Sequence, residues 1–148
     1  MKLCVKQQIF SFRDRFYVTD ENGAQVFYIE SEIFTFFKKF HIYAMTGEEV
    51  GYIEQRFSLI LPRLDIYIHG EHSASIQKQF TLFCQEYSVE GVNWYVSGDF
   101  FSHEYEITRS GAPVAHISKE WFTFGDCYTV ETLHPQDMLL SLAVMVSI

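Results

Sequence analysis

Two lysines stand inside an aromatic run, Phe36-Phe37-Lys38-Lys39-Phe40, and this arrangement could bind an anionic headgroup. Ammonium groups attract phosphate or carboxylate groups, and the neighbouring rings could enter a lipid interface. Arg56 and Arg63 add to such a site only if the fold brings them close. The alternative is a solvated connection between strands with its rings in the core, which the acidic composition favours. Lys38, Lys39, Arg56 and Arg63 are the candidate anion or lipid contacts.

Histidines stand near carboxylates at two further places. The run His69-Gly70-Glu71-His72 could chelate a metal ion, but no third partner stands at a diagnostic spacing. His103, with Glu104 and Asp99, could form an acid–base pair. An exposed turn and a strand-end hydrogen bond explain the same residues without any chemistry, and we favour that interpretation.

No motif for catalysis accompanies these residues. The sequence has no nucleophile elbow, phosphate-binding loop or metal-binding helix motif, and no Ser or Cys has a recognisable activating neighbour. Asp14 and Asp126 occupy equivalent positions in similar segments, which indicates a shared structural task such as capping a turn. We therefore predict no catalytic residue, no metal site and no cofactor.

The elements that carry these residues are short strands joined by tight turns. Fifteen Phe and nine Tyr alternate with Ile, Val and Thr in short runs, which is typical of half-buried strands. An isoleucine follows six residues after each of four turn glycines, namely Gly23, Gly47, Gly70 and Gly111. Four phenylalanines keep nearly the same step, namely Phe10, Phe34, Phe57 and Phe80. The sequence therefore predicts a recurring β-hairpin.

Alternation along each predicted strand assigns the side chains to two faces. The inward set is Phe16, Val18, Phe27, Ile29, Phe40, Ile42, Gly51, Ile53, Leu64, Ile66, Ala74, Ile76, Tyr105, Ile107, Ala115 and Ile117. The outward set is Tyr17, Tyr28, His41, Tyr52, Asp65, Ser75, Glu106 and His116. With Tyr43 and Tyr67, the outer tyrosines are predicted to form an aromatic stripe that suits a protein partner.

The last segment predicts a helix. Pro135 suits the first helical position and Asp137 suits the first turn. From Met138 to Ile148 the only polar residues are Ser141 and Ser147, so this helix is apolar on all sides and must be surrounded. The segment is far shorter than the roughly 20 residues that span a bilayer.

The repeated hairpins are the obvious container for this helix. They supply about a dozen strands, and a barrel of about 11 strands can hold a helix along its axis. Small inward residues at Gly51, Ala74 and Ala115 would let the helix approach. We predict a mainly β fold, a closed antiparallel barrel of about 12 strands around a helix over 135–148. Solvent should not reach Leu139 or Met145, nor Leu142 between them.

Length and charge limit the classes of function. The 148 residues, 48% of them hydrophobic, fit one domain over 1–148. Eleven Lys and Arg against 19 Asp and Glu give a net charge of −8, which disfavours nucleic-acid binding and polybasic membrane adhesion. Cys4, Cys84 and Cys127 are widely spaced without a CxxC, so no disulfide framework or zinc site is expected. With no export signal or transmembrane segment visible, we predict a cytoplasmic protein.

The chain resembles the LURP-one-related proteins of the tubby C-terminal-like superfamily over essentially its full length. The matching stretches are Phe10 to Gly23 (FSFRDRFYVTDENG), Phe57 to Ile68 (FSLILPRLDIYI), Gly98 to Ile107 (GDFFSHEYEI) and Ile117 to Glu131 (ISKEWFTFGDCYTVE). The resemblance implies a closed barrel of about twelve strands around a central C-terminal helix. Tubby domains bind phosphoinositide headgroups and scramblase relatives act at membranes, but the tubby headgroup motif does not map onto positions here.

Three functions follow as hypotheses. The first is a non-enzymatic intracellular binding module with a peripheral membrane or phospholipid-headgroup role, which the superfamily suggests. The second is a protein-interaction or regulatory module without lipid binding, which the outer tyrosines suggest. The third is a small-molecule enzyme that uses His103 or the His69 and His72 turn. The sequence leaves the oligomeric state open.

Overall fold

The computed structural model describes residues 1–8, 14–32, 34–99, 101–122 and 125–148. Over these ranges the chain forms strands and one C-terminal helical segment. The strands are β1 (Lys2–Gln7), β2 (Arg15–Thr19), β3 (Gln25–Ser31), β4 (Lys39–Ala44), β5 (Glu49–Arg56), β6 (Arg63–Ile68), β7 (Glu71–Lys78), β8 (Cys84–Glu90), β9 (Trp94–Asp99), β10 (Glu104–Arg109), β11 (Ala112–Phe122) and β12 (Gly125–Thr132).

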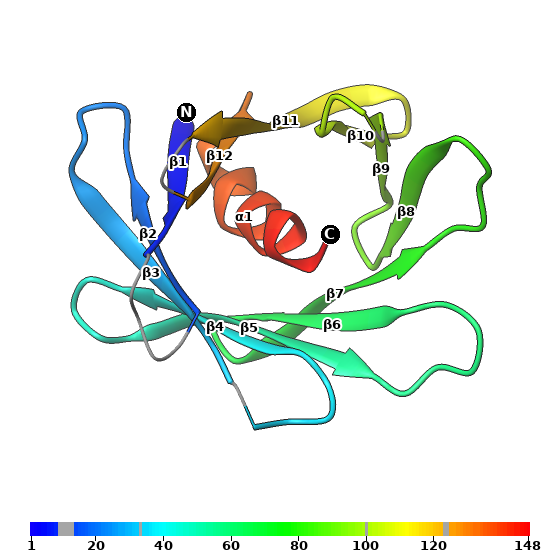
Figure 1. Cartoon of the computed structure of the whole chain (residues 1–148), viewed down its shortest axis with the longest axis horizontal. Helices are drawn as coiled ribbons and strands as arrows, with labels where there is room; N and C mark the ends of the chain where they lie inside the picture. The colour runs from blue at the N-terminus through cyan, green and yellow to red at the C-terminus, as the bar shows by residue number, and fades with distance from the viewer. Residues whose placement is uncertain (9–13, 33, 100, 123–124) are drawn as a thin grey trace.

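The strands form a closed barrel in which each strand pairs antiparallel with its neighbours in sequence (Figure 1). β1 pairs with both β2 and β12, and this second pairing closes the sheet. Closure removes the unpaired backbone edges that an open sheet exposes. The predicted closed antiparallel barrel of about twelve strands around a C-terminal helix is confirmed.

Glycines at positive φ make the tight turns of the hairpins. φ is 79° at Gly23, 91° at Gly47, 80° at Gly70 and 83° at Gly111, a region where residues with a Cβ are strained. A register shift precedes four of the turns at the same place in each hairpin, for example between Val18 and Thr19. Such a bulge with a left-handed glycine is typical of short hairpin loops, so the predicted repeat is a repeat of turn geometry.

Isoleucines and valines from the hairpins form the core, as strand alternation predicts. Nine of the predicted inward residues are only 0 or 1% exposed: Val18, Ile29, Ile42, Ile53, Ile66, Ala74, Ile76, Ile107 and Ile117. Glu106 and His116 are exposed on the outer face. Asp65 and Ser75 depart from the expectation for outward residues, because they are buried at 8% and 3% exposure. Longer side chains from neighbouring strands cover them, as described below.

The helical segment lies inside the barrel, against β12, β5 and β6. It begins with a 3₁₀ turn, Pro135–Asp137, and continues as α1, Met138–Ser147. Arg109 Nη2 donates to Asp137 Oδ1 at 3.0 Å and fixes the start of the helix to the end of β10.

The burial of the helix follows the prediction at two of three positions. Leu142 and Met145 are buried, at 0 and 7% exposure. The expectation for Leu139 is wrong, because its side chain is partly exposed. Leu139 belongs to the first turn of α1, beside one open end of the barrel. Gly51 was expected to make room for the helix. A Cβ at this position would instead meet side-chain atoms of Ile42 on β4.

An up-and-down barrel has two different ends. The tight turns β2–β3, β4–β5, β6–β7, β8–β9 and β10–β11 lie at one end, here called the turn end. The connections β1–β2, β3–β4, β5–β6, β7–β8, β9–β10 and β11–β12 lie at the other, here called the loop end. The helix runs from the turn end toward the loop end. Among the described residues, no helix has the length and apolar character needed to cross a membrane.

Candidate functional site

Exposed apolar side chains concentrate at the loop end. Fourteen large hydrophobic side chains are exposed in the described ranges, and ten of them lie on loop-end connections. The ten are Phe34, Phe36, Phe37, Phe57, Leu59, Ile60, Phe80, Leu82, Phe83 and Phe101. The other four are Met1, Met45, Tyr95 and Leu133. Several of the ten are almost fully in solvent, such as Phe34 at 96% and Leu59 at 88%. Exposed apolar groups gathered in this way are typical of a surface that contacts a partner or a lipid interface.

The four predicted anion contacts lie together at this end. Lys38 directly precedes β4 and Lys39 is its first residue, Arg56 ends β5 and Arg63 begins β6. Arg56 and Arg63 are register partners, and Gln55 N donates to Lys38 O across the adjacent pair of strands. Four cations therefore lie at or beside three neighbouring strand ends, next to the connections that carry exposed apolar side chains.

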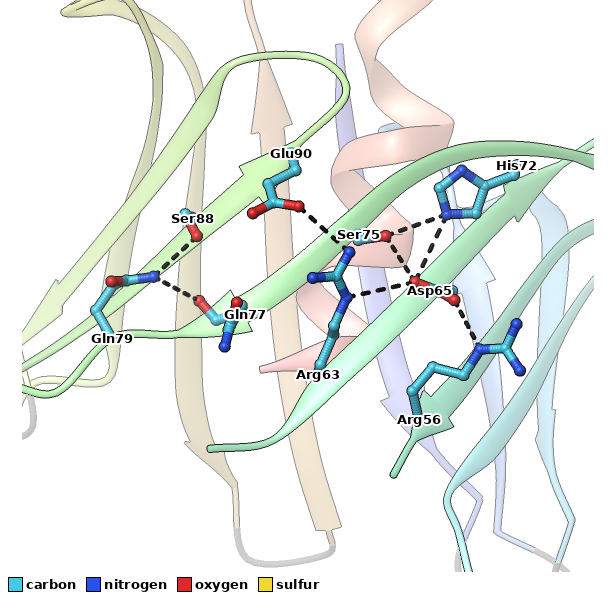
Figure 2. Close-up of polar contacts among 9 residues, drawn as sticks. All are labelled: Arg56, Arg63, Asp65, His72, Ser75, Gln77, Gln79, Ser88 and Glu90. Carbon is cyan, nitrogen blue, oxygen red and sulfur yellow. Dashed lines mark hydrogen bonds and ion pairs between the residues drawn. The ribbon is translucent and has the colours of Figure 1, made fainter. Parts of the chain in front are cut away.

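Acidic residues already engage part of this charge. Arg56 Nε donates to Asp65 Oδ2 at 2.8 Å, and Arg63 Nε lies 3.9 Å from Asp65 Oδ1 (Figure 2). Arg63 also reaches Glu90 at 3.2 Å. Lys39 Nζ lies 4.0 Å from a Glu32 oxygen.

Asp65 is the centre of a hydrogen-bonded cluster on the outer face. Ser75 Oγ donates to Asp65 Oδ1 at 2.6 Å, and His72 Nε2 lies 3.1 Å from Ser75 Oγ (Figure 2). Burial by itself raises the pKa of Asp65, but hydrogen bonds from Arg56, Ser75 and His72 outweigh it, so the pKa lies below its usual value. The carboxylate therefore stays ionised and holds the two arginines at fixed positions.

The predicted tyrosine stripe is present on the outer face of β2 to β6. Tyr17 pairs in register with Tyr28, which pairs with Tyr43, and Tyr52 pairs with Tyr67. The Tyr28 and Tyr43 rings stack with centroids 5.0 Å apart, and the Tyr52 and Tyr67 rings lie 5.8 Å apart. His41 completes the row, since its ring lies 5.9 Å from that of Tyr43 and 5.0 Å from that of Tyr52.

A cavity of about 350 Å³ lies inside the barrel at the loop end. Its floor is the C-terminal end of α1, and its wall carries inward residues of β1 to β4, β8 and β10 to β12. The lining residues are Val5, Phe16, Ile29, Phe40, Gln85, His103, Tyr105, Ile117, Lys119, Tyr128, Met145, Val146 and Ile148. In Figure 1 the C-terminal end of α1 lies within the ring of strands.

The histidines considered for chemistry are placed in two ways. His69 and His72 are exposed in the β6–β7 turn, where His72 turns toward Ser75. His103 lines the cavity, and its backbone N–H donates to the carbonyl oxygen of Asp99 at 3.2 Å. Asp99 Oδ1 accepts from the N–H of Phe101 at 2.7 Å, which is the strand-end use that the sequence favoured. Within the described ranges, no three His, Cys, Asp or Glu side chains gather in a way that could hold a metal ion.

Asp14 takes part in strand pairing through its backbone. The backbone oxygen of Asp14 accepts from Ser31 N at 3.0 Å, so this residue contributes to pairing at the edge of β3. The side chain of Asp126 lies outside the described residues, as does Phe10 of the phenylalanine series. Cys4, Cys84 and Cys127 are free thiols.

Comparison with known proteins identifies the family to which this chain belongs. The family model for LURP-one-related proteins matches residues 1–148. The chain belongs to the LURP-one-related family. A relative in Bacillus subtilis (strain 168), the uncharacterised protein YxjI, is 27% identical over 146 residues, which cover 99% of this chain and 90% of YxjI. This LURP-one-related chain also matches the X-ray structure of an Arabidopsis thaliana protein with a TM-score of 0.51 and 17% identity, over 99% of this chain and 90% of that one. The structural likeness supports the fold.

The sequence analysis did not predict the ten exposed apolar side chains at the loop end, although the sequence contains a signal for them. Phe34, Phe57 and Phe80 recur with the same step as the turn glycines, half a repeat away from them. In an up-and-down barrel, positions half a repeat from one set of turns lie at the opposite end. The period therefore locates these rings at the loop end, even though strand alternation alone says nothing about connections.

Proposed function

We propose that this protein is a non-enzymatic binding module that docks on anionic membrane surfaces through its loop end. The observation that carries the proposal is the group of ten exposed apolar side chains on the loop-end connections, with Lys38, Lys39, Arg56 and Arg63 at or beside the adjoining strand ends. Rings of Phe that enter the interface would lose contact with water, at about 1.5 to 3 kcal/mol for each fully buried side chain. Each cation near an anionic surface adds about 1 kcal/mol to the binding free energy.

The net charge of −8 opposes this docking less than its size suggests. Several of the acids lie at the turns of the opposite end, namely Asp20, Glu21, Glu48 and Glu71. Strands of six to eight residues separate the two ends by about 20 to 26 Å. That separation exceeds the Debye length of about 8 Å at physiological salt. The turn-end acids therefore favour an orientation with the loop end toward the bilayer.

Flotation with liposomes tests the proposal. The full chain should float with vesicles that contain phosphatidylserine or phosphoinositide, more strongly at low than at physiological salt, and weakly with pure phosphatidylcholine. Replacing Phe36 and Phe57 together by Ser should weaken binding at least tenfold, because insertion supplies the larger contribution. Replacing Lys38 and Lys39 by Gln should weaken binding to anionic vesicles by about fivefold for each lysine.

Matched controls lie at the turn end. Met45→Ser removes an exposed apolar side chain and Lys2→Gln removes an exposed cation, both away from the loop end. These variants should bind vesicles as the unmodified chain does. Absence of flotation with anionic vesicles at low salt would refute membrane docking, and equal losses in control and test variants would refute the assignment to the loop end.

The tyrosine stripe supports a second candidate, docking of a protein partner on the outer face of β2 to β6. Its rings form a continuous half-buried row, and tyrosine is enriched at protein interfaces. Light scattering of the isolated chain tests the simplest partner, a second copy. Tyr28→Ser and Tyr52→Ser should then lower the apparent mass, whereas a monomeric mass at all concentrations excludes this partner.

A further inference from the structure

The cavity at the loop end has two unlike walls. On β1 to β4 the lining is apolar and comprises Val5, Phe16, Ile29 and Phe40. On β8 and β10 to β12 the wall carries polar groups beside the apolar Ile117. They are Gln85, Tyr105, Lys119 and Tyr128, with His103 just before β10. A pocket with one apolar and one polar wall matches a ligand that has one apolar and one polar part.

Lys119 is the unusual member of the polar wall. It stands two residues after Ile117, which is 1% exposed, so strand alternation directs both side chains into the barrel. Its partner in register is Tyr128, and Lys119 Nζ lies 5.3 Å from the centre of the Tyr128 ring. A cation over an aromatic face is stabilised there. The structure thus places a positive charge at the wall of a largely apolar space.

Hydrogen bonds hold the other polar side chains of this wall in place. Tyr105 Oη donates to Gln85 Oε1 at 2.6 Å, which links β10 to β8 across β9. Gly98 on β9 makes this link possible, because a Cβ there would collide with the Tyr105 ring. The amide of Gln85 therefore lies beside the phenol at a fixed position, and its N–H groups are donors suited to an anion.

Charge and size define the ligand further. None of the described lining residues is acidic, whereas Lys119 carries a positive charge. At about 30 Å³ for each water-sized group, the 350 Å³ hold about a dozen methylene-sized groups. This volume fits one chain of about ten carbon atoms with a small headgroup, and it falls in the range of ligand pockets, about 300 to 1,000 Å³.

We propose that this cavity binds one unbranched aliphatic chain with an anionic headgroup, the chemistry of a fatty acid. The chain lies among Phe16, Phe40 and the end of α1, and the carboxylate lies beside Lys119 and Gln85. This binding does not depend on membrane docking, because a soluble fatty acid can enter the cavity from water.

Titration of the full chain with decanoate, followed by NMR and calorimetry, tests the proposal without vesicles. Decanoate should bind with one-to-one stoichiometry and shift the resonances of Val146, Ile148 and Tyr128. Decyltrimethylammonium, a cation with the same chain, should bind at least tenfold more weakly. Shifts confined to exposed loop residues such as Phe36 and Phe57, or no saturable binding, would overturn the proposal whether or not the protein floats with liposomes.

Two variants separate the roles of charge and space. Lys119→Met should remove the preference for decanoate over the cationic probe, while Lys78→Met, which changes a lysine that does not line the cavity, should keep it. Ile148→Phe should fill part of the space and weaken decanoate at least tenfold. Thermal melting confirms that each variant is folded. Unchanged decanoate affinity in folded Ile148→Phe and Lys119→Met would place the binding elsewhere.

Discussion

His41 is held between two carboxylates on the outer face of β4. Its Nδ1 lies 2.7 Å from Glu49 Oε2 and its Nε2 lies 2.8 Å from Glu32 Oε1. Both ring nitrogens can donate at once only in the imidazolium form. Partial burial lowers the pKa of His41, but the hydrogen bonds and charges of Glu32 and Glu49 outweigh it, so the pKa lies above its ordinary value.

This raised pKa predicts how stability changes with pH. A group whose pKa is higher in the folded state gives stability that is fully present below its unfolded pKa, about 6.5 for His. That stability is lost as the pH rises through the folded pKa. We expect the free energy of unfolding, measured with urea, to fall over this interval by no more than about 1 kcal/mol for partly exposed pairs. His41→Gln should flatten the change, and an NMR titration of His41 with its midpoint below 6.5 would contradict the prediction.

Ser141 is a second residue with a measurable cost. It is fully buried in α1, and its Oγ has no hydrogen-bond partner among the described residues. A buried hydroxyl without a partner costs about 1 to 3 kcal/mol, and Ala is the better helix former. Ser141→Ala should therefore stabilise the protein by about 1 kcal/mol and raise the melting temperature by about 2 to 4 °C.

Ser147 is the matched control for this prediction. Its Oγ donates to the carbonyl oxygen of Ala143 at 2.7 Å, and its side chain is only half buried. Ser147→Ala on the same helix should leave the melting temperature unchanged or lower it slightly. A stabilisation of equal size in both variants would show that helix propensity alone, rather than burial of the Ser141 hydroxyl, is responsible.

At the scale of elements, β9 and β10 are fitted to each other through Gly98 and Tyr105. The two residues are register partners, and the Tyr105 ring occupies the space of a side chain at Gly98. Gly98→Ala should push the ring away, break its hydrogen bond to Gln85 and destabilise the protein by about 1 to 3 kcal/mol. Urea unfolding measures this loss.

A double-mutant cycle isolates this fit from other effects of the added methyl group. In a Tyr105→Ala background the ring is absent, so Gly98→Ala should cost much less than in the unmodified chain. Equal costs in the two backgrounds would mean that backbone strain at Gly98, rather than contact with Tyr105, makes the glycine necessary.

The elements show which features a sequence can predict. Hairpins were predictable because turn glycines and inward isoleucines depend on residues close in the chain, and six positions from Gly23 to Ile29 are enough to show them. The burial of Asp65 was not, because it depends on Arg56, Arg63 and His72, which reach over it from β5, β6 and β7. The cavity was not predictable either, since it depends on where α1 ends within the closed sheet.

The candidate anion site lies between these two cases. Lys38 and Lys39 were chosen because they stand among phenylalanines, and the sequence alone could not say whether Arg56 and Arg63 lie nearby. Antiparallel pairing of β4, β5 and β6 brings all four to one end. The net charge counted from the sequence also does not show that Asp65 pairs with Arg56 and that Glu90 pairs with Arg63.

At the scale of the whole molecule, sheet and helix depend on each other. α1 is apolar on all sides, and its Leu142 is 0% exposed inside the barrel. Without the helix, the inward isoleucines of the strands would face an empty interior. Without the closed sheet, the helix would expose its whole surface to water. Neither part has another way to bury its apolar residues.

This dependence predicts a single unfolding transition. Far-UV circular dichroism, which reports backbone structure, and tryptophan fluorescence, to which the 3% exposed Trp94 contributes, should give the same urea midpoint. Leu142→Ala leaves a cavity between helix and sheet and should lower the free energy of unfolding by about 2 to 5 kcal/mol, shifting both midpoints equally. Leu139→Ala removes the same groups from a partly exposed site and should cost clearly less. Separate midpoints would mean that the barrel keeps its shape after the helix has left it, and the helix would then be a removable plug rather than the core.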